Sequence, residues 1–372
     1  MSGFAVVIPS AITDEEKVTK MTEWLCRNGD EEPQLSDSQQ ATALISAIHT
    51  NCGFVRNDTK SVKRKFVFLK THKTASTTLQ TMVARTASRY QLVDLRCVMP
   101  HEERLPHFIS ELVCDKDTKF PLPRGADFVM SHVLDKTYWW NVRPDNPSSC
   151  DYFGGFWFDH YVDKVHAAIQ DNDAPIIIPL REQYNHLQSV LKYYGVNVSK
   201  YIQNEDLWNP ASLDIRLLSD KDVTTFLEKY VNSAYSRLII PLLTETLDES
   251  LVAMRRTMNW NLSDVIYMST FHTGAPPKPV QEDFKERTKK TLTLDKKLYK
   301  GFEKLNTKLQ KRVNTPDFYL EVLSLKRINS LAAKVCNCHE KTRSMDIESL
   351  VWWCNHLCIT EIELDDVTNC LE

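Results

Sequence analysis

The chain has 372 residues, of which ten are cysteines, and a formal net charge of −3 at pH 7. This length allows one large domain or two small ones, and the charge gives no reason to expect a nucleic-acid partner. No window of about 18 consecutive apolar residues occurs, so no transmembrane helix is predicted. The cysteines are too few for a disulfide framework and leave the redox compartment open, and the oligomeric state stays open as well.

The first 60 residues predict a helical extension. Thr13–Glu16 and Ser36–Gln39 have the pattern of capping boxes, and apolar residues at helical spacing follow each of them. Met1–Ser10 contains no basic segment and only a brief apolar run, which is not typical of a signal peptide. From these residues we expect a cytoplasmic protein, unless a membrane anchor lies outside this sequence.

The middle of the chain alternates strand and helix patterns, which predicts an α/β fold with a parallel sheet covered on both faces. The expected strands are Phe66–Leu69, Phe128–Ser131, Ile176–Leu180 and Val265–Met268. Apolar residues from Asp222 to Ile240 repeat at helical spacing and predict the clearest helix of the chain. Two more helices are expected, one that includes Leu298–Leu309 and one that runs from Pro316 to Val335.

A loop rich in lysine and hydroxyl residues follows the first expected strand. Residues 66–80 read FVFLKTHKTASTTLQ, and a helical pattern begins after Thr78. A loop that opens a helix presents free N–H groups and the positive end of the helix dipole, and lysines and hydroxyls add further donors. We therefore expect a site for a phosphate-like anion, although an ordinary capped helix behind a solvated turn is the alternative. The usual P-loop pattern is absent, and no glycine lies between Gly53 and Gly125.

A second anion-binding pattern follows the strand Ile176–Leu180. Arg181 comes directly after this strand, and Ser189 lies two helical turns further along the next expected helix. An arginine and a serine in this arrangement can hold one phosphate from two sides. The alternative is a structural ion pair and an unremarkable helix serine.

Two histidines are candidates for acid–base chemistry. His132 follows the strand Phe128–Ser131, and open α/β sheets place their ligands at this end of their strands. The ordinary pKa of histidine suits proton abstraction near neutrality. His72, within the lysine-rich loop, is the competing candidate, or it orients the transferred group instead.

Two further segments leave alternatives open. Tyr138–Phe158 is rich in aromatic residues and glycine, and it is either a stacking wall for a sugar or a packed excursion of the chain. Cys336–His339 and Cys354–Cys358 contain cysteine and histidine at a spacing that fits no zinc motif. We expect disulfides or buried thiols in these segments rather than zinc.

The segment Phe68–Thr78 resembles the loop that binds the 5′-phosphosulfate of 3′-phosphoadenosine 5′-phosphosulfate (PAPS) in galactose-3-O-sulfotransferases, the family that includes the galactosylceramide enzyme. Arg181 and Ser189 resemble the 3′-phosphate site of sulfotransferases, but Gln183 stands where the family commonly has proline. The segments Leu247–Val252 and Trp260–Tyr267 extend the resemblance over roughly residues 65–270.

The resemblance implies a P-loop-like three-layer sandwich with a central parallel sheet and helical extensions. We expect an N-terminal extension at 1–60, a catalytic domain at 61–330 and a cysteine-containing extension at 331–372. Members of this family are Golgi membrane proteins with one N-terminal anchor. The Golgi lumen is therefore the alternative compartment.

The resemblance also implies transfer of the sulfuryl group of PAPS to a hydroxyl of a carbohydrate or small polar metabolite. No metal is required, since lysines can carry the positive charge. The catalytic candidates are His132 as base, Lys73 at the leaving oxygen and His72. The residues expected to bind PAPS are Lys70, Thr71, His72, Lys73, Thr74, Ala75, Ser76, Thr77, Thr78, Arg181 and Ser189. A P-loop-like kinase and a non-catalytic ligand-binding relative are the alternatives.

Overall fold

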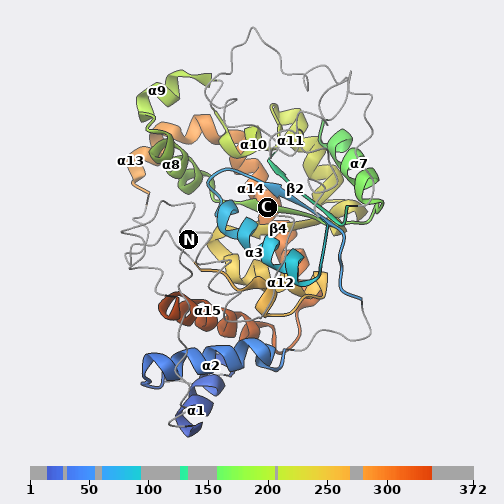
Figure 1. Cartoon of the computed structure of the whole chain (residues 1–372). Helices are drawn as coiled ribbons and strands as arrows, with labels where there is room; N and C mark the ends of the chain where they lie inside the picture. The colour runs from blue at the N-terminus through green and yellow to red at the C-terminus, as the bar shows by residue number, and fades with distance from the viewer. Residues whose placement is uncertain are drawn as a thin grey trace, which may run out of the picture.

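The computed structural model describes residues 15–27, 32–54, 61–93, 126–132, 157–205, 208–268 and 280–336. Its centre is a parallel sheet of four strands in the order β2-β1-β3-β4 (Figure 1). The strands are β1 (Phe66–Lys70), β2 (Phe128–His132), β3 (Ile176–Leu180) and β4 (Ile239–Leu243). Their continuous apolar sequences suit a parallel sheet that is buried on both faces. The predicted α/β class is confirmed at this level.

Alternate residues of the strands enter two separate hydrophobic cores. Phe66 and Phe68 of β1 belong to one core, and Val67 and Leu69 belong to the other. This division follows from the period of two along a strand, which sends successive side chains to opposite faces. The helices of the first core are α3 (Ser76–Arg89) and α12 (Leu247–Met258), and those of the second are α7 (Trp157–Ile169), α11 (Asp220–Phe226) and α14 (Thr293–Val313).

The first core extends beyond α12 into three helices that lie at the opposite end of the molecule from α8 and α9 (Figure 1). These are α1 (Glu15–Cys26), α2 (Asp37–His49) and α15 (Phe318–Val335), and all three were predicted. The second expected capping box is present in part, because the Gln39 side chain accepts a hydrogen bond of 3.1 Å from the backbone N–H of Ser36. A disulfide joins Cys26 to Cys52.

Shorter helices connect these elements. The α-helices are α8 (Gln183–Tyr194), α9 (Val198–Gln203), α10 (Pro210–Asp214) and α13 (Glu282–Thr288). The 3-10 helices are η1 (Asn51–Gly53), η6 (Ala234–Arg237), η7 (Thr244–Thr246), η8 (Ser263–Val265) and η9 (Lys289–Leu292). Of these, α8 and α10 position the site described below.

The helix predicted from Asp222 to Ile240 is wrong in its second half. Helix α11 continues into a π-helical turn at Leu227–Val231, and after η6 the chain enters β4 at Ile239. Pro241 rules out a helix through the run Ile239–Leu243, because a proline in a helix interior removes a hydrogen bond and clashes with the preceding turn. A short apolar run such as Ile239–Leu243 fits a buried helix or a buried strand equally well.

The strand predicted at Val265–Met268 is also wrong. Val265 ends η8, Ile266–Met268 form no strand, and backbone carbonyls of η8 and of Ile266 bind an arginine instead. Arg85 of α3 donates to the carbonyl of Ile266 at 2.7 Å and to that of Ser263 at 3.2 Å. The apolar side chains are buried in the first core as expected, but α3 supplies the hydrogen bonds that a neighbouring strand would have made.

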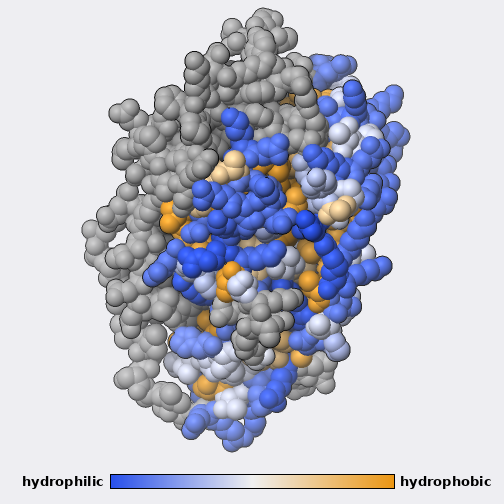
Figure 2. All heavy atoms as spheres, turned by 90° about the vertical axis from the view of Figure 1, so that its right-hand side faces the viewer, coloured by the Kyte–Doolittle hydropathy of each residue, from blue (hydrophilic) through white to orange (hydrophobic). Residues whose placement is uncertain are grey.

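On the face shown in Figure 2, hydrophilic residues cover most of the described surface and hydrophobic ones show between them in small areas. Within the described ranges, no helix combines the length and hydrophobicity that crossing a bilayer requires. The aromatic segment that begins at Tyr138 lies outside the described residues up to its end, where Phe158 is fully buried in the second core. Of the two cysteine–histidine segments, only Cys336 is described, and it is disulfide-bonded.

Candidate active site

The strand order predicts a ligand crevice at the carboxyl ends of β1 and β3. The chain leaves β1 to form β2 on one side and later adds β3 on the other side, which makes this the topological switch point of the sheet. The two strands pair at Val67–Ile176 and Phe68–Ile177 and no further. The lysine-rich loop follows β1 and Arg181 follows β3, so both predicted anion-binding segments meet at this crevice.

Hydrogen bonds of two threonine hydroxyls connect the loop to β3. The Thr71 hydroxyl donates to the carbonyl of Pro179 at 2.6 Å, and the Thr74 hydroxyl lies 2.7 Å from that of Thr71. Both side chains are fully buried. Their hydroxyls therefore hold the loop in place, and these two positions offer a ligand their backbone rather than their side chains.

The loop backbone has the form of an anion-binding turn. Lys73 and Ala75 have φ angles of 57° and 58°, which is the left-handed region. Left-handed residues alternating along a turn bring successive N–H groups to one side, where they attract anions. Helix α3 begins at Ser76, and the N–H groups of its first turn have no partner within the helix. The hydroxyls of Ser76, Thr77 and Thr78 make no hydrogen bond to any described residue.

Two cations meet at the crevice. The Lys73 ammonium lies 3.8 Å from the centre of the Tyr193 ring, and the Arg181 guanidinium donates to the Lys73 carbonyl at 3.5 Å. Burial lowers the pKa of Lys73, and the charge of Arg181 lowers it further. Burial also lowers the pKa of Arg181. Among the described residues, neither cation forms an ion pair with a carboxylate.

The carboxylates near Arg181 are bound to other donors. Glu182 accepts from the N–H groups of Tyr184 and Asn185 at 3.0 and 2.9 Å and so caps α8. Glu245 accepts from the N–H of Glu182 at 3.1 Å and from the hydroxyl of Tyr299 at 3.0 Å. Glu245 and Glu182 attract Arg181 from nearby without pairing with it directly, so an added anion would meet two cations that no described carboxylate contacts.

Helix α8 supplies the remaining predicted contacts. Ser189 is half-buried, and Tyr193 lies one turn further along on the same face. Gln183, at the position where the family commonly has proline, is the first residue of α8. Proline suits this position but is not needed there, so the helix begins normally. On the other side of the loop, Lys70 donates to Gln80 of α3 at 2.6 Å.

His72 is held at three points by residues far away in the sequence. Its Nδ1 lies 2.7 Å from one carboxylate oxygen of Asp214, and its backbone N–H donates to the other at 2.7 Å. His186 of α8 donates from Nε2 to the His72 carbonyl at 2.7 Å. Burial lowers the pKa of His186, which keeps this imidazole neutral. Reasoning from sequence missed both Asp214 and His186, because no local pattern marks either of them.

His132 ends β2, where its backbone pairs with Lys70 at the end of β1. Its side chain lies outside the described part of the structure. All the predicted site residues are thus carried by the carboxyl ends of three neighbouring strands and by the helices that follow β1 and β3.

Comparison with known proteins points to one family. A family model described as galactose-3-O-sulfotransferase matches residues 170–346, a range that contains Arg181 and Ser189 but not the loop after β1. Galactosylceramide sulfotransferase of Bos taurus is 23% identical over 302 residues, which cover 74% of this chain and 64% of that protein. Galactose-3-O-sulfotransferase 2 of Mus musculus is 23% identical, with coverages of 64% and 60%.

Galactose-3-O-sulfotransferase 3 of Homo sapiens is 25% identical over 237 residues, which cover 58% of this chain and 50% of that protein. The chain thus spans less than two thirds of the length of these relatives. No solved structure matches it. The predicted resemblance to galactose-3-O-sulfotransferases is confirmed.

The expected cytoplasmic localisation is wrong. The matched relatives are galactosylceramide and galactose-3-O-sulfotransferases, and they point to the compartment that the resemblance to this family implied, the Golgi lumen. The disulfide between Cys26 and Cys52 agrees with this correction, because disulfides form and persist in oxidising compartments. The composition of the N-terminal residues was not a sufficient guide to the compartment.

Proposed function

We propose that this chain is a sulfotransferase that moves the sulfuryl group of PAPS to a hydroxyl of a carbohydrate acceptor. The observation that carries the proposal is the pair of cations Lys73 and Arg181 at the switch point of the sheet, without carboxylate partners among the described residues. The relatives support the reaction, since each of those named above is a sulfotransferase.

The residues present fit a nucleotide with phosphates at two positions. In the proposal, the N–H groups of residues 74–78 and the hydroxyls of Ser76, Thr77 and Thr78 bind the 5′-phosphosulfate, with Lys70 beside them. Arg181 and Ser189 bind the 3′-phosphate from the other side of the crevice. The unit from β1 to α3 then serves as the phosphate-binding loop of a P-loop-like sandwich, and residues 61–330 form the catalytic domain.

The chain's own groups would place charge and protons for an in-line transfer. Bound PAPS would supply the activated sulfuryl group. Lys73 would stabilise the negative charge that collects on the leaving phosphate oxygen as the sulfur–oxygen bond breaks. A histidine would take the proton of the acceptor hydroxyl while its oxygen forms the new bond to sulfur. His72 and His132 both lie at this end of the sheet, and the contacts of His72 with Asp214 favour His72 as the base.

Labelled-sulfate transfer from PAPS tests the proposal. The acceptor panel would hold terminal galactosides, galactosylceramide and small polar metabolites, and the proteins would be wild type, Lys73→Ala and Lys192→Ala. Lys192 is an exposed lysine of the same crevice helix, α8, and serves as the matched control. We expect transfer to a carbohydrate, on the order of 100-fold slower turnover for Lys73→Ala, and no change for Lys192→Ala.

Three results would overturn the proposal. They are the absence of transfer to every acceptor, equal turnover of Lys73→Ala and wild type, and transfer of phosphate from ATP with Mg²⁺ in the same panel. The last would restore the kinase alternative, while the first would favour a ligand-binding relative without turnover.

A further inference from the structure

Asp214 makes a bidentate contact with His72. One carboxylate oxygen lies 2.7 Å from the Nδ1 of the ring, and the other accepts the backbone N–H at 2.7 Å. Both side chains are buried, with 8% of His72 and 2% of Asp214 exposed. An ionised carboxylate can only accept hydrogen bonds, so in the neutral ring the nitrogen that faces it must carry the proton.

The position of Asp214 is fixed by α14, which packs in the same second core as α10. Asp214 ends α10, whose N-terminus is bound by Asp295 of α14: the carboxylate of Asp295 accepts from the N–H groups of Ala211 at 3.0 Å and Ser212 at 2.7 Å. In return the Asn209 side chain accepts from the N–H of Leu294 at 2.8 Å. The two helices cap each other, and this reciprocal contact orients Asp214 before any ligand arrives.

We propose that Asp214 is a positioning residue that sets the tautomer of His72. With Nδ1 protonated and facing Asp214, Nε2 is the basic nitrogen of the ring. When Nε2 takes the acceptor proton, the carboxylate of Asp214 stabilises the imidazolium that results. This inference rests on the proposed function, because it is sulfuryl transfer to a hydroxyl that needs a base. The neutral His186, which donates to the His72 carbonyl, fixes the loop without adding charge.

The substitution Asp214→Asn separates this role from simple packing. Asparagine has nearly the same shape, and its oxygen can still accept the backbone N–H of His72. Its amide nitrogen would then face Nδ1 as a donor, so Nδ1 must accept and the ring proton moves to Nε2. A residue that only packs would tolerate this exchange. We expect turnover to fall on the order of 100-fold to 10,000-fold, the range that a positioned acid–base group contributes, with the upper end being the loss seen when a serine-protease triad loses its tautomer.

The experiment combines three measurements on the full chain. Nitrogen-15 histidine spectra of wild type and Asp214→Asn, with His72→Gln to assign the signal, report the tautomer directly. Sulfate transfer to a terminal galactoside reports turnover, and titration calorimetry with adenosine 3′,5′-bisphosphate reports nucleotide binding. Asp214→Glu restores a carboxylate, and Asp220→Asn removes an exposed carboxylate six residues further on as the control.

We expect the proton of His72 on Nδ1 in wild type and on Nε2 in Asp214→Asn, with bisphosphate affinity unchanged within about threefold and partial recovery of turnover in Asp214→Glu. A wild-type signal with the proton on Nε2, or near-normal turnover of Asp214→Asn, would overturn the assignment. Loss of bisphosphate binding together with turnover would also overturn it, since Asp214 would then be structural.

The wild-type spectrum decides the tautomer even if the variant does not fold. If wild type transfers no sulfate to any acceptor, the proposed function fails while the spectrum still tests the contact between Asp214 and His72. The two failures are therefore distinguishable.

Discussion

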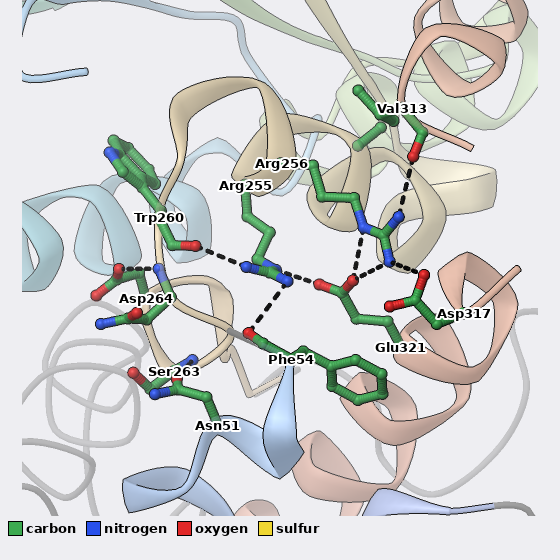
Figure 3. A network of polar contacts seen from close by, with 12 residues as sticks. Asn51, Phe54, Arg255, Arg256, Trp260, Ser263, Asp264, Val313, Asp317 and Glu321 are labelled. Atoms are coloured by element: carbon green, nitrogen blue, oxygen red, sulfur yellow. Dashed lines mark hydrogen bonds and ion pairs between the residues drawn. The ribbon is translucent and has the colours of Figure 1, made fainter. Parts of the chain in front are cut away.

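Charged residues gather in a buried network between α12 and α15 and, half-buried, at the switch point of the sheet, and these two regions differ in how their charges are matched. Between α12 and α15, the two oxygens of Glu321 accept from Arg255 and Arg256 (Figure 3). The remaining N–H groups of these arginines reach the carbonyls of Trp260 at 2.8 Å and Val313 at 2.9 Å. Within the contacts that Figure 3 draws, every charge has an opposite charge or a hydrogen-bond partner.

At the switch point of the sheet, two cations lie together and neither pairs with a carboxylate among the described residues. Lys73 and Arg181 lie together, and the nearby carboxylates of Glu182 and Glu245 are engaged by other donors. A buried charge alone does not mark a functional site, because structural networks also bury charges. Two cations held together without a directly paired carboxylate among the described residues are the basis of the proposal, in which an anionic ligand supplies the missing partner.

The largest effect on stability is expected in the network of Glu321, Arg255 and Arg256. Glu321→Gln leaves Arg255 without a carboxylate partner and Arg256 with only the exposed Asp317, and we expect the free energy of unfolding to fall by about 3–5 kcal/mol. Urea denaturation followed by circular dichroism would measure it. Asp173→Asn is the control, because Asp173 pairs with Arg237 in an exposed ion pair worth at most about 1 kcal/mol. Equal losses in the two variants would mean that burial of the network contributes nothing.

At the site of Lys73 and Arg181 we expect a substitution to reduce nucleotide affinity without reducing the stability of the fold. Arg181→Ala removes a cation that lies beside Lys73, so the free energy of unfolding should stay the same or rise. Affinity for adenosine 3′,5′-bisphosphate should fall by about 1.5–3 kcal/mol, as a lost hydrogen bond to a charged group does. Denaturation and titration calorimetry on the same sample separate the two effects. A variant that loses stability but keeps normal affinity would show that Arg181 is a structural cation, as Arg255 and Arg256 are, and not a ligand-binding one.

Acidification should affect the site through His186. Because burial lowers the pKa of this histidine in the folded state, its contribution to stability is complete above the ordinary value of 6.5. Below that pH the unfolded chain binds a proton that the folded chain does not, so stability falls. His186→Gln keeps a donor to the His72 carbonyl but does not titrate. Once the pH lies below both the folded-state and the unfolded-state pKa of His186, the free energy of unfolding of wild type relative to this variant should have decreased. The decrease is about 1.4 kcal/mol for each unit by which these two pKa values differ. A difference that is independent of pH from 5 to 8 would contradict this account.

The smallest effect concerns the loop backbone. Ala75 has a left-handed φ of 58°, which favours glycine, so Ala75→Gly should raise the free energy of unfolding by about 0.5–1 kcal/mol. Ala167→Gly, at an exposed position in the last turn of α7, should lower it by at most about 1 kcal/mol. Thermal unfolding of both variants measures the contrast. If both are destabilised equally, the loop does not hold the left-handed turn that an anion site requires.

The anion-binding segments were predictable because their signals are local. Lys73 and Arg181 each follow a continuous apolar strand, and strand, polar loop and helix pattern occur within a short stretch of sequence. Lys73 and Arg181 lie together only because β3 is next to β1 in the sheet. The alternation of strand and helix patterns in the sequence favours this strand order but does not specify it. The strand β4 was missed because its apolar run continues a helical pattern, and only Pro241 distinguishes the two. Asp214 could not have been found, since it lies on a short helix 142 residues from His72 and is positioned by contacts with α14.

Calorimetric titration of the wild-type chain with adenosine 3′,5′-bisphosphate, ADP and ATP with Mg²⁺ tests the central claim most directly. The claim is that the unmatched cations after β1 and β3 form one site for a nucleotide with phosphates at both positions. The account predicts that the bisphosphate binds at least tenfold more tightly than ADP or ATP, which is a difference of about 1.4 kcal/mol or more. Equal affinity for ATP, or no binding of the bisphosphate, would contradict it.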